Sequence, residues 1–311
     1  MKIIFFGTSD IAAVALEALS AAGGHNIVRV VTQADKPKGR GQRIGVSPVK
    51  VLAKEKRLAI VQPKDLLEKE FLAQLGKDSA ELFVVCSYGK ILPKELLQIP
   101  EIYTINLHLS LLPCYRGAAP IQWALINGEA LTGVTIFKMN EYLDRGEMIL
   151  KKEIAITAGD TAATLTETLS QLGAGALVEA INLIAKGQAP LLAQDDQKAT
   201  LAPKLKKEDG RIDWKQPAQK IQQRVRGLQP WPGAFTDYQG KLLKIIQSEV
   251  VPLGEQKNSG EIVEVDQQQG ILVQTGLDGL LLQQLQLAGK RKMSAQEFIA
   301  GHKLIVGDSL G

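Results

Sequence analysis

The sequence predicts an α/β fold: a Rossmann-like, mostly parallel sheet with helices on both faces, joined by a linker to a small C-terminal OB-like β-barrel. Three observations predict it. The first half alternates apolar runs with amphipathic segments, which is typical of βαβ units. A polar stretch with few periodic apolar positions follows. The rest shows short apolar runs separated by Gly-containing turns, as in a small barrel. We therefore expect domains at 1–188 and 206–311, with a linker at 189–205.

The chain opens with one βαβ unit. An apolar run at 3–7 predicts a strand, the helical spacing that follows predicts a helix over about 9–22, and residues 27–31 predict the next strand. The turn at 7–10 lacks the G-x-G-x-x-G pattern of dinucleotide binding. This argues against an NAD-dependent enzyme.

A basic, Gly-rich stretch lies at 36–50. It holds five basic residues, no acidic residue and three glycines. So polar a stretch cannot be a core element, and we expect an exposed, mobile, cationic loop. Composition alone leaves two interpretations open: a loop that charge keeps solvated, or a surface for nucleic acid.

A helix start and a candidate ligand loop follow the basic stretch. Ser47 and Pro48 predict the N-cap and the first residue of a helix. Another helix is expected at 66–75 and a buried strand at 81–86, which ends in a loop at 87–93. Ligands of open α/β sheets lie off the carboxyl ends of the strands. The loop at 87–93 is therefore a candidate binding site.

An amide and an imidazole stand at the end of the next predicted strand. Apolar residues at 102–105 run into Asn106 and His108. Because side chains alternate along a strand, these two should point the same way. The chain then crosses a Pro- and Gly-rich loop into a helix at about 118–127. A polar site at this edge of the sheet is predicted.

An acidic loop at 140–146 follows a further predicted strand at 133–139. Its Asp144 could complete the polar group formed by the amide and the imidazole. The chain then continues to a long helix, which we expect Asp160 to cap and Gly187 to end.

The C-terminal part is typical of a small basic barrel. A helix at 214–227 and a Pro-rich turn at 229–235 are expected first, and a capping box at 294–297 opens a final helix. Strands are expected between them, at 241–251, 260–266, 270–275 and 279–287. From Lys204 onward the chain holds 15 basic and 12 acidic residues, a net of +3 out of the whole chain's +4. Small barrels of this kind often bind oligonucleotides, although a fold does not dictate function.

The overall composition is that of a globular protein. The 311 residues are 45% hydrophobic and 23% charged, and no stretch approaches the roughly 20 apolar residues of a membrane span. The two cysteines, Cys86 and Cys114, form no CxxC pair, which argues against a disulfide framework and a zinc site. We expect a cytoplasmic protein without membrane association, and a monomer, because nothing in the sequence is typical of an assembly segment.

Residues 105–122, INLHLSLLPCYRGAAPIQ, resemble the signature of formyltransferases that use 10-formyltetrahydrofolate. More narrowly, the chain resembles the family that acts on methionyl-tRNA, across nearly its whole length. The supporting segments, in order, are FGTSD at 6–10, VTQADKPKGRG at 31–41, SPVK at 47–50, YGKILP at 88–93, TGVTI at 132–136, GRIDW at 210–214 and GKRKM at 289–293.

The resemblance implies a catalytic group of Asn106, His108 and Asp144. The residue types suit the chemistry. An amide can donate to an oxyanion without titrating, and an imidazole can shuttle a proton near working pH. Asp144 would fix the tautomer and orientation of the imidazole. No metal or nucleophilic side chain is needed. Taken alone, the same residues have ordinary structural explanations, since a histidine at a strand end and an aspartate before Gly-containing turns are common.

The resemblance also implies the two substrates. For 10-formyltetrahydrofolate it implies a pterin pocket with apolar walls, closed by the acidic loop and lined by Cys86, Ser87, Tyr88, Gly89, Ile91, Ser110, Leu111, Leu112 and Pro113. Plain core packing is the alternative for the two leucines. For initiator methionyl-tRNA it implies basic contacts from the 36–50 stretch and from the barrel, at Lys36, Lys38, Arg40, Arg43, Lys290, Arg291 and Lys292.

The chain departs from the family pattern at four positions. Cys114 stands where the family usually has Arg, and Leu109 where it has a small residue. Tyr142 and Arg145 replace the usual Gly and Thr beside Asp144. None removes a group that the reaction needs, so these departures bear on pocket shape and efficiency.

Two alternatives remain open at the level of the sequence. One is a formyltransferase that acts on a small amine such as a nucleotide-linked amino sugar, which would have no use for the cationic stretch. The other is a nucleic-acid-binding protein with a catalytically idle α/β domain.

Overall fold

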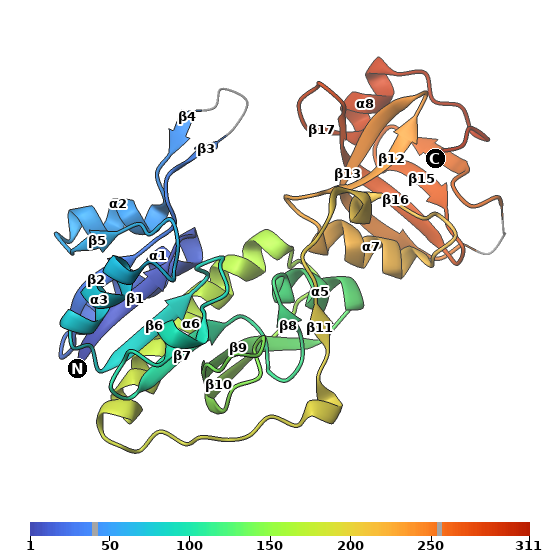
Figure 1. Ribbon diagram of the computed structural model, residues 1–311. Helices are drawn as coiled ribbons and strands as arrows, with labels where there is room; N and C mark the ends of the chain where they lie inside the picture. Colours follow the sequence, from blue (N-terminus) through green and yellow to red (C-terminus); the bar gives the residue numbers. More distant parts are fainter. Residues whose placement is uncertain (39–42, 254–256) are drawn as a thin grey trace. The chain divides into compact units, whose positions relative to one another are not determined.

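The computed structural model describes residues 1–38, 43–253 and 257–311 (Figure 1). The chain forms two compact units. The first comprises residues 1–120, 131–155 and 166–202, and the second comprises residues 121–130, 156–165 and 203–311.

A seven-stranded sheet organises the first unit. Its strand order is β10-β9-β7-β6-β1-β2-β5. The five strands from β5 to β7 are parallel, whereas β9 pairs antiparallel with both β7 and β10. The mostly parallel sheet predicted from the sequence is confirmed. The strands are β1 (Lys2–Gly7), β2 (Asn26–Val31), β5 (Ile60–Val61), β6 (Leu82–Cys86), β7 (Tyr103–His108), β9 (Leu131–Lys138) and β10 (Met148–Ala155).

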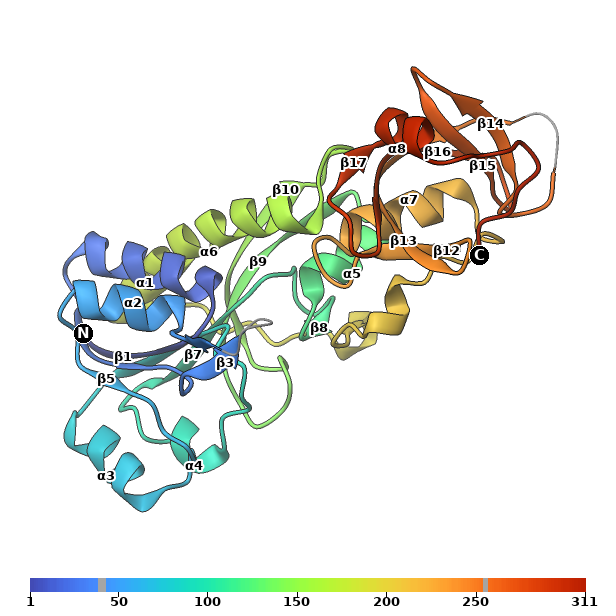
Figure 2. The same ribbon diagram turned by 90° about the horizontal axis from the view of Figure 1, so that it is seen from above.

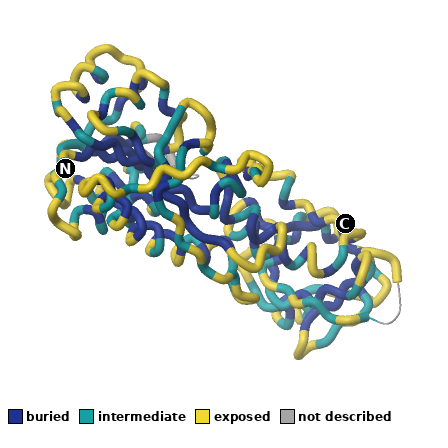
Figure 3. The backbone as a smooth tube through the Cα atoms, turned by 90° about the horizontal axis from the view of Figure 1, so that it is seen from below, coloured by how far each residue is buried: buried dark blue, intermediate teal, exposed yellow. Residues whose placement is uncertain are grey.

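Helices cover both faces of this sheet (Figure 2). On one face, α3 (Lys69–Lys77) and α4 (Lys94–Leu97) pack on β1 and β6 through a continuous apolar core. On the other lie α1 (Asp10–Ala22), α2 (Pro48–Glu55) and α6 (Ala162–Ala185). The central strands β1 and β6 are accordingly buried along almost their whole length, as Figure 3 shows.

Helix α6 is long and apolar enough, by composition, to cross a membrane. Half of its most apolar window is buried within the protein, however, and Leu169, Leu177 and Ile181 are fully enclosed. A Cβ on Gly173 would lie 2.9 Å from the Leu107 side chain of β7. These contacts are those of a core helix packed on a sheet.

Local capping explains where the helices begin. The hydroxyls of Ser9 and Ser47 accept from the backbone N–H groups of Ala12 and Lys50, which satisfies donors in the first turns of α1 and α2. The expected N-cap of α6 was wrong by one residue. The backbone N–H of Thr164 donates to the Thr161 hydroxyl, whereas Asp160 accepts from Thr157.

The basic stretch contains a hairpin, which the sequence did not predict. Strands β3 (Lys36–Lys38) and β4 (Arg43–Gly45) pair antiparallel. Where we expected only an exposed, mobile, cationic loop, these six residues are paired as two strands. Hydrogen bonds between the two backbones form this pairing, and no apolar pattern in the sequence predicts it.

The second unit contains a six-stranded antiparallel sheet. Five strands follow the order β12-β13-β16-β15-β14, and β17 pairs with β16. The expected C-terminal domain of short β-strands is confirmed, and its strands are antiparallel. No strand pairing within the described ranges joins β14 to β12, so backbone hydrogen bonds do not close the sheet there. The strands are β12 (Ala234–Tyr238), β13 (Lys241–Val251), β14 (Ile262–Asp266), β15 (Gly270–Gln274), β16 (Gly279–Leu287) and β17 (Met293–Ser294).

Three helices belong wholly or mostly to this unit: α5 (Pro120–Asn127), α7 (Ala218–Gly227) and α8 (Ala295–Gly301). The expected capping box opens α8, where the Ser294 hydroxyl and the Glu297 carboxylate accept reciprocally from backbone N–H groups. Helix α7 begins four residues later than expected. Strand β12 occupies part of the turn predicted at 229–235.

The predicted linker contains two further short elements. The single turn η1 (Asp196–Lys198) precedes β11 (Leu201–Ala202), which pairs with β8 (Arg116–Gly117) in the first unit. Another single turn, η2 (Lys207–Gly210), opens the C-terminal part. Part of the predicted linker therefore packs against the loop that follows β7.

Candidate active site

The carboxyl ends of the central strands meet at one edge of the sheet. Gly7, the last residue of β1, is in register with Cys86 at the end of β6, and Cys86 is in register with Leu107 of β7. The strand order also reverses at β1, because β2 lies on one side and β6 on the other. A reversal of this kind leaves a crevice between diverging loops, where ligands of such sheets bind.

Two of the predicted catalytic side chains stand at this edge on β7. Asn106 and His108 are two residues apart within the strand and therefore project from the same face. Asn106 is half-buried, and His108 is buried with 7% of its surface exposed. The predicted pairing of an amide with an imidazole at a strand end thus has the required backbone geometry.

Both ring nitrogens of His108 have identifiable neighbours. Nε2 lies 2.9 Å from the backbone carbonyl oxygen of Tyr115. Because a carbonyl can only accept, Nε2 must carry the hydrogen of this bond, which leaves Nδ1 available to exchange a proton. Nδ1 lies 3.7 Å from Oδ2 of Asp144. The third predicted catalytic residue is therefore brought to the imidazole from a loop 36 positions farther along the chain.

The expected role of Asp144 needs one correction. We expected its carboxylate to fix the tautomer of the imidazole, but the Tyr115 carbonyl does so. At 3.7 Å the carboxylate is beyond direct hydrogen-bond distance of Nδ1, so only its charge can influence the ring at this distance. Its Oδ2 accepts instead from the backbone N–H of Gly117, at 2.8 Å. Neither Tyr115 nor Gly117 was singled out from the sequence, since backbone groups leave no signal in residue type.

The loop after β7 is rigidly bonded. The Ser110 hydroxyl donates to the Cys114 carbonyl at 2.6 Å. The Thr135 hydroxyl donates to the Ser110 carbonyl and accepts from the Leu112 backbone N–H. Of the residues predicted for folate, Ser110 and Leu112 are thus buried, and these hydrogen bonds hold them within the protein. Leu111 and Pro113 are half-buried.

The loop after β6 is also held from its backbone. The Tyr88 carbonyl accepts from the Thr8 hydroxyl at 3.0 Å and from the Gln33 amide at 2.7 Å. Ser87 and Gly89 both adopt positive φ angles around it, which Gly tolerates without strain. Ser87 and Gly89 are exposed at the sheet edge.

Two side chains predicted to line the pterin pocket lie in the core instead. The Tyr88 ring packs edge-on against Phe6, and its hydroxyl has no hydrogen-bond partner among the described residues. Burial raises the pKa of Tyr88 to about 12. Cys86 is enclosed as well, and burial raises the pKa of its thiol to about 12. Their side chains therefore pack in the core, and only their backbone groups are left to contact a ligand at this loop.

Three apolar side chains remain exposed on the neighbouring loops. Ile91 is 83% exposed, Tyr142 60% and Leu143 59%. The two loops approach one another where Nζ of Lys94 lies 4.0 Å from Oε1 of Glu141. Exposed apolar side chains next to a buried polar group are typical of a binding site for a flat, partly aromatic ligand.

The structure describes only some of the side chains predicted to contact tRNA. Arg40 lies outside the described residues, and only the backbone of Lys36, Lys38 and Arg43 is described. In the turn between β16 and β17, Lys290, Arg291 and Lys292 are all exposed. Arg291 binds Glu297 at 2.6 Å, and this hydrogen bond raises the pKa of Arg291 and lowers that of Glu297. Its charge is therefore partly neutralised within the protein.

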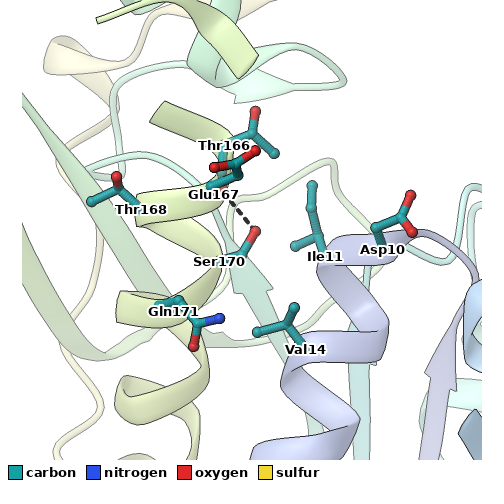
Figure 4. A pocket seen from close by; sticks show the side chains of 8 residues that line it. All are labelled: Asp10, Ile11, Val14, Thr166, Glu167, Thr168, Ser170 and Gln171. Carbon is teal, nitrogen blue, oxygen red and sulfur yellow. Dashed lines mark hydrogen bonds between the residues drawn. The ribbon is translucent and has the colours of Figure 1, made fainter. Parts of the chain in front are cut away.

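A cavity of about 520 Å³ lies elsewhere, between residues 10–14 of α1 and residues 166–171 of α6 (Figure 4). None of the residues predicted for catalysis or for folate lines it. The one polar side chain buried there, Ser170, donates to the Thr166 carbonyl. The His108 and Asp144 cluster is the better candidate for an active site, because it combines a buried imidazole and a largely buried carboxylate with the sheet edge.

Metal ligands were not expected from the sequence. Within residues 1–38, 43–253 and 257–311, no group of three or more His, Cys, Asp or Glu side chains is arranged to hold a metal ion.

Comparisons with known proteins extend over the whole chain. Residues 1–181 match the family model described as "Formyl transferase", and residues 204–303 match "Formyl transferase, C-terminal domain". A "Methionyl-tRNA formyltransferase" from Caldanaerobacter subterraneus subsp. tengcongensis is 43% identical over 311 residues, which cover 100% of both chains. One from Geobacter metallireducens is 44% identical over 311 residues, with 100% of this chain and 99% of the other covered.

A solved structure shares the fold at low identity. It is an N-formyltransferase from Helicobacter canadensis in complex with folinic acid and dTDP-3-aminofucose. The TM-score is 0.65 at 18% identity, and the match covers 91% of this chain and 99% of the other.

Proposed function

The chain belongs to the formyl transferase family, and we propose that it transfers the formyl group of 10-formyltetrahydrofolate to the α-amino group of methionine on initiator methionyl-tRNA. The product would enter translation initiation. The supporting observation is a single one: a chain alignable end to end with methionyl-tRNA formyltransferases presents a buried imidazole and a largely buried carboxylate, 3.7 Å apart, at the carboxyl edge of its sheet.

Asn106 stabilises charge in this proposal. When the amine attacks the formyl carbon, the formyl oxygen gains negative charge, and the Asn106 amide is placed at the strand end to donate to it. An amide does not titrate, so it can donate at any working pH.

His108 moves the proton. The attacking amine loses a proton as its bond to the formyl carbon forms, and N10 of the folate gains one as its bond to that carbon breaks. With Nε2 bonded to the Tyr115 carbonyl, Nδ1 is the atom that accepts and returns this proton. Asp144 faces Nδ1 and stabilises the imidazolium that exists between the two steps.

The exposed apolar side chains fit the folate. Ile91, Tyr142 and Leu143 lie on the loops beside the catalytic group and would gain most by covering a flat heterocycle. Because the Tyr88 and Cys86 side chains are in the core, the β6 loop would contribute its backbone groups. The proposed pocket thus keeps the residues Ser87, Gly89, Ile91, Leu111 and Pro113 from the sequence-based set.

The tRNA would bind through backbone phosphates. We assign this role to the β3–β4 hairpin with Arg40, and to Lys290 and Lys292 in the C-terminal domain. Arg291 is a weaker candidate because Glu297 already binds it.

We also retain the expected domain boundaries, the cytoplasmic location and the monomeric state as proposals.

The chief alternative is transfer to an amino sugar. The structure from Helicobacter canadensis contains such a nucleotide-linked sugar, and it shares this fold. An identity of 18% supports the fold alone, however, and a sugar substrate leaves the basic hairpin and the basic C-terminal residues without a role.

A direct assay distinguishes the substrates. The purified protein is offered 10-formyltetrahydrofolate with charged initiator tRNA, with free methionine, or with a nucleotide-linked amino sugar. We expect formylation of methionyl-tRNA alone, measured as formylmethionine released after alkaline hydrolysis. His108→Ala serves as the inactive control. Formylation of the sugar but not of the tRNA would refute the proposal.

A further inference from the structure

The segment predicted as a linker reaches the catalytic loop through one side chain, Gln194. The amide nitrogen Nε2 of Gln194 donates to two backbone carbonyls of that loop, those of Asp144 at 2.8 Å and Gly146 at 2.7 Å. Its carbonyl oxygen Oε1 accepts from Nε and Nη2 of Arg116, at 3.1 and 2.7 Å. The side chain therefore connects the loop after β7 with the loop before β10.

These contacts allow one orientation of the amide. Arginine can only donate, so Oε1 must face Arg116, and backbone carbonyls can only accept, so Nε2 must face the loop. Both hydrogens of the amide are used, and both acceptor positions are occupied. A glutamate, a methionine or a shorter side chain cannot reproduce this set of bonds.

The other ends of the connection are fixed. Arg116 is buried, with 3% of its surface exposed, and its Nη2 also lies 2.8 Å from Oδ1 of Asp196. Leu192 and Met148 exchange backbone hydrogen bonds, which attaches the segment before Gln194 to the start of β10. Gln194 therefore lies between two residues of its own segment, Leu192 and Asp196, that are both bonded to the rest of the first unit, and these bonds fix its position.

Asp144 needs such a support. It adopts φ of +51°, in the left-handed region that residues other than glycine adopt at a cost. Its carboxylate is bound on one side by the Gly117 N–H and faces His108 on the other. Two residues farther on, a Cβ on Gly146 would lie 1.6 Å from the Lys138 carbonyl oxygen, so the backbone of Lys138 packs directly against the end of this loop. The bond from Gln194 to the Asp144 carbonyl holds the backbone in this strained state.

We propose that Gln194 is a positioning residue for formyl transfer, which holds the Asp144 carboxylate at its working distance from His108. This inference rests on the proposed function. Gln194 contacts no reacting atom and acts through the backbone of the acidic loop. Its loss leaves the charge of Asp144 in the protein but lets the loop relax from its strained conformation, so that the carboxylate moves away from Nδ1.

Such a displacement affects turnover more than binding. The imidazolium that Asp144 stabilises exists only during the reaction, so its loss lowers kcat and leaves KM nearly unchanged. Misplacement of a catalytic group by about 1 Å can cost about 100-fold in rate. We expect Gln194→Met to lower kcat by about 10- to 100-fold, with each KM within about threefold of the wild type.

The test uses the full-length protein and two substitutions. Gln194→Met keeps the length of the side chain without its hydrogen bonds, and Gln194→Glu keeps an acceptor for Arg116 but places a carboxylate against two carbonyls. Gln197→Met is the matched control, because Gln197 lies in the same segment with its side chain exposed. A thermal melt checks that each variant is folded.

A double-mutant cycle separates positioning from a merely structural role. In the Asp144→Asn background, Gln194→Met should change kcat by less than about threefold, because the carboxylate that it positions is already absent. A full additional loss in that background, a wild-type kcat in Gln194→Met, or a loss carried by KM alone would each refute the inference.

A second readout does not depend on the substrate. Hydrogen exchange of the backbone amides at 140–147 should be faster in Gln194→Met than in the wild type or Gln197→Met. Unchanged exchange there would refute the positioning role. If exchange rises while the wild type fails to formylate methionyl-tRNA, then the proposed function is wrong and the support of Asp144 by Gln194 stands.

Discussion

At the scale of single residues, His108 is set by a backbone group and a distant carboxylate. The Tyr115 carbonyl fixes which nitrogen carries the hydrogen, and Asp144 faces the other. The imidazole therefore enters the reaction with one nitrogen already committed. Asn106, two residues before it on β7, supplies the remaining contribution: a donor to the developing oxyanion.

Replacing Asn106 with alanine should lower kcat by about 10²–10³-fold, as in other sites that lose one oxyanion donor. The KM for methionyl-tRNA should change little, because the negative charge develops only during the reaction. Steady-state kinetics of formylation measure both values. Asn182→Ala is the control, since Asn182 is an exposed residue of α6 that hydrogen-bonds His25, away from this site. An Asn106→Ala enzyme within threefold of the wild type would rule out the oxyanion role.

The two cysteines should differ sharply in reactivity. Cys86 is 1% exposed and burial raises the pKa of its thiol to about 12, so it is protonated and covered at neutral pH. Cys114 is half-buried in the loop after β7. We expect iodoacetamide to modify one thiol per folded chain, at Cys114, and both thiols in urea. Mass spectrometry of tryptic peptides provides the measurement, and labelling of Cys86 in the folded chain would contradict it.

At the scale of elements, the sequence predicts structure where the signal is local. Ser47 and Pro48 predict the start of α2, and the capping box at Ser294 and Glu297 predicts the start of α8. Both signals depend only on neighbours within one helical turn. In the first sheet, β1, β2, β6, β7 and β9 are likewise visible as apolar runs, whereas β5 and β10 were not predicted. The β3–β4 hairpin is not, because two three-residue strands without apolar alternation give no periodic pattern.

The candidate site shows the same limit. Asn106 and His108 are paired by strand alternation, which the sequence displays directly. The position of its loop after the next strand offers Asp144 only as a possible third member, since 36 residues separate it from His108, and the resemblance to the family is what assigns it a catalytic role. The contribution of Gln194 was invisible because it depends on hydrogen bonds to backbone carbonyls across 48 and 50 positions. Its segment looks like a linker in composition.

The turn between β16 and β17 gives an element-scale test of tRNA binding. If about five basic residues meet phosphates, the logarithm of the affinity should fall against the logarithm of the salt concentration with a slope of about −4 to −5. Replacing both Lys290 and Lys292 with glutamine should make the slope shallower by about 2. Fluorescence anisotropy with labelled initiator tRNA measures these slopes.

Arg291→Gln is the matched comparison in the same turn. Because Arg291 binds Glu297, its removal should alter the slope by less than about 0.5. An equal effect of Arg291→Gln and of a single lysine substitution would mean that the ion pair opens for RNA. A slope near zero for the wild type would contradict binding through phosphates altogether.

At the scale of the whole molecule, the two units carry different optical probes. All three tryptophans, Trp123, Trp214 and Trp231, belong to the second unit, so fluorescence reports on that unit. Cys86 and Tyr88 belong to the first, where both side chains are in the core. A dependence of stability on alkaline pH that originates in these two groups therefore belongs to the unfolding of the first unit. Far-UV circular dichroism follows this unit together with the second.

We expect the first unit to lose stability as the pH rises above 9. Burial raises the pKa of Cys86 from 9.0 to about 12 and that of Tyr88 from 10.0 to about 12. Between these values each group ionises in the unfolded chain but stays neutral in the folded one. The unfolded state then binds fewer protons, so the free energy of unfolding decreases with pH. The contribution of each group to the free energy of unfolding is therefore complete below its pKa in the unfolded chain, and it is lost as the pH rises toward its pKa in the folded chain.

Substitution of Cys86 isolates its share of this effect. The thiol should account for a decrease of about 2 kcal/mol in the free energy of unfolding between about pH 8.5 and about pH 10.5, which urea titrations followed by circular dichroism can measure. In Cys86→Ala that share of the pH dependence should vanish, while the lost packing lowers stability equally at every pH. Val85→Ala, beside it on β6 and also buried, should show the constant loss and keep the wild-type pH dependence. Parallel curves for the wild type and Cys86→Ala would show that the buried thiol does not contribute to alkaline destabilisation.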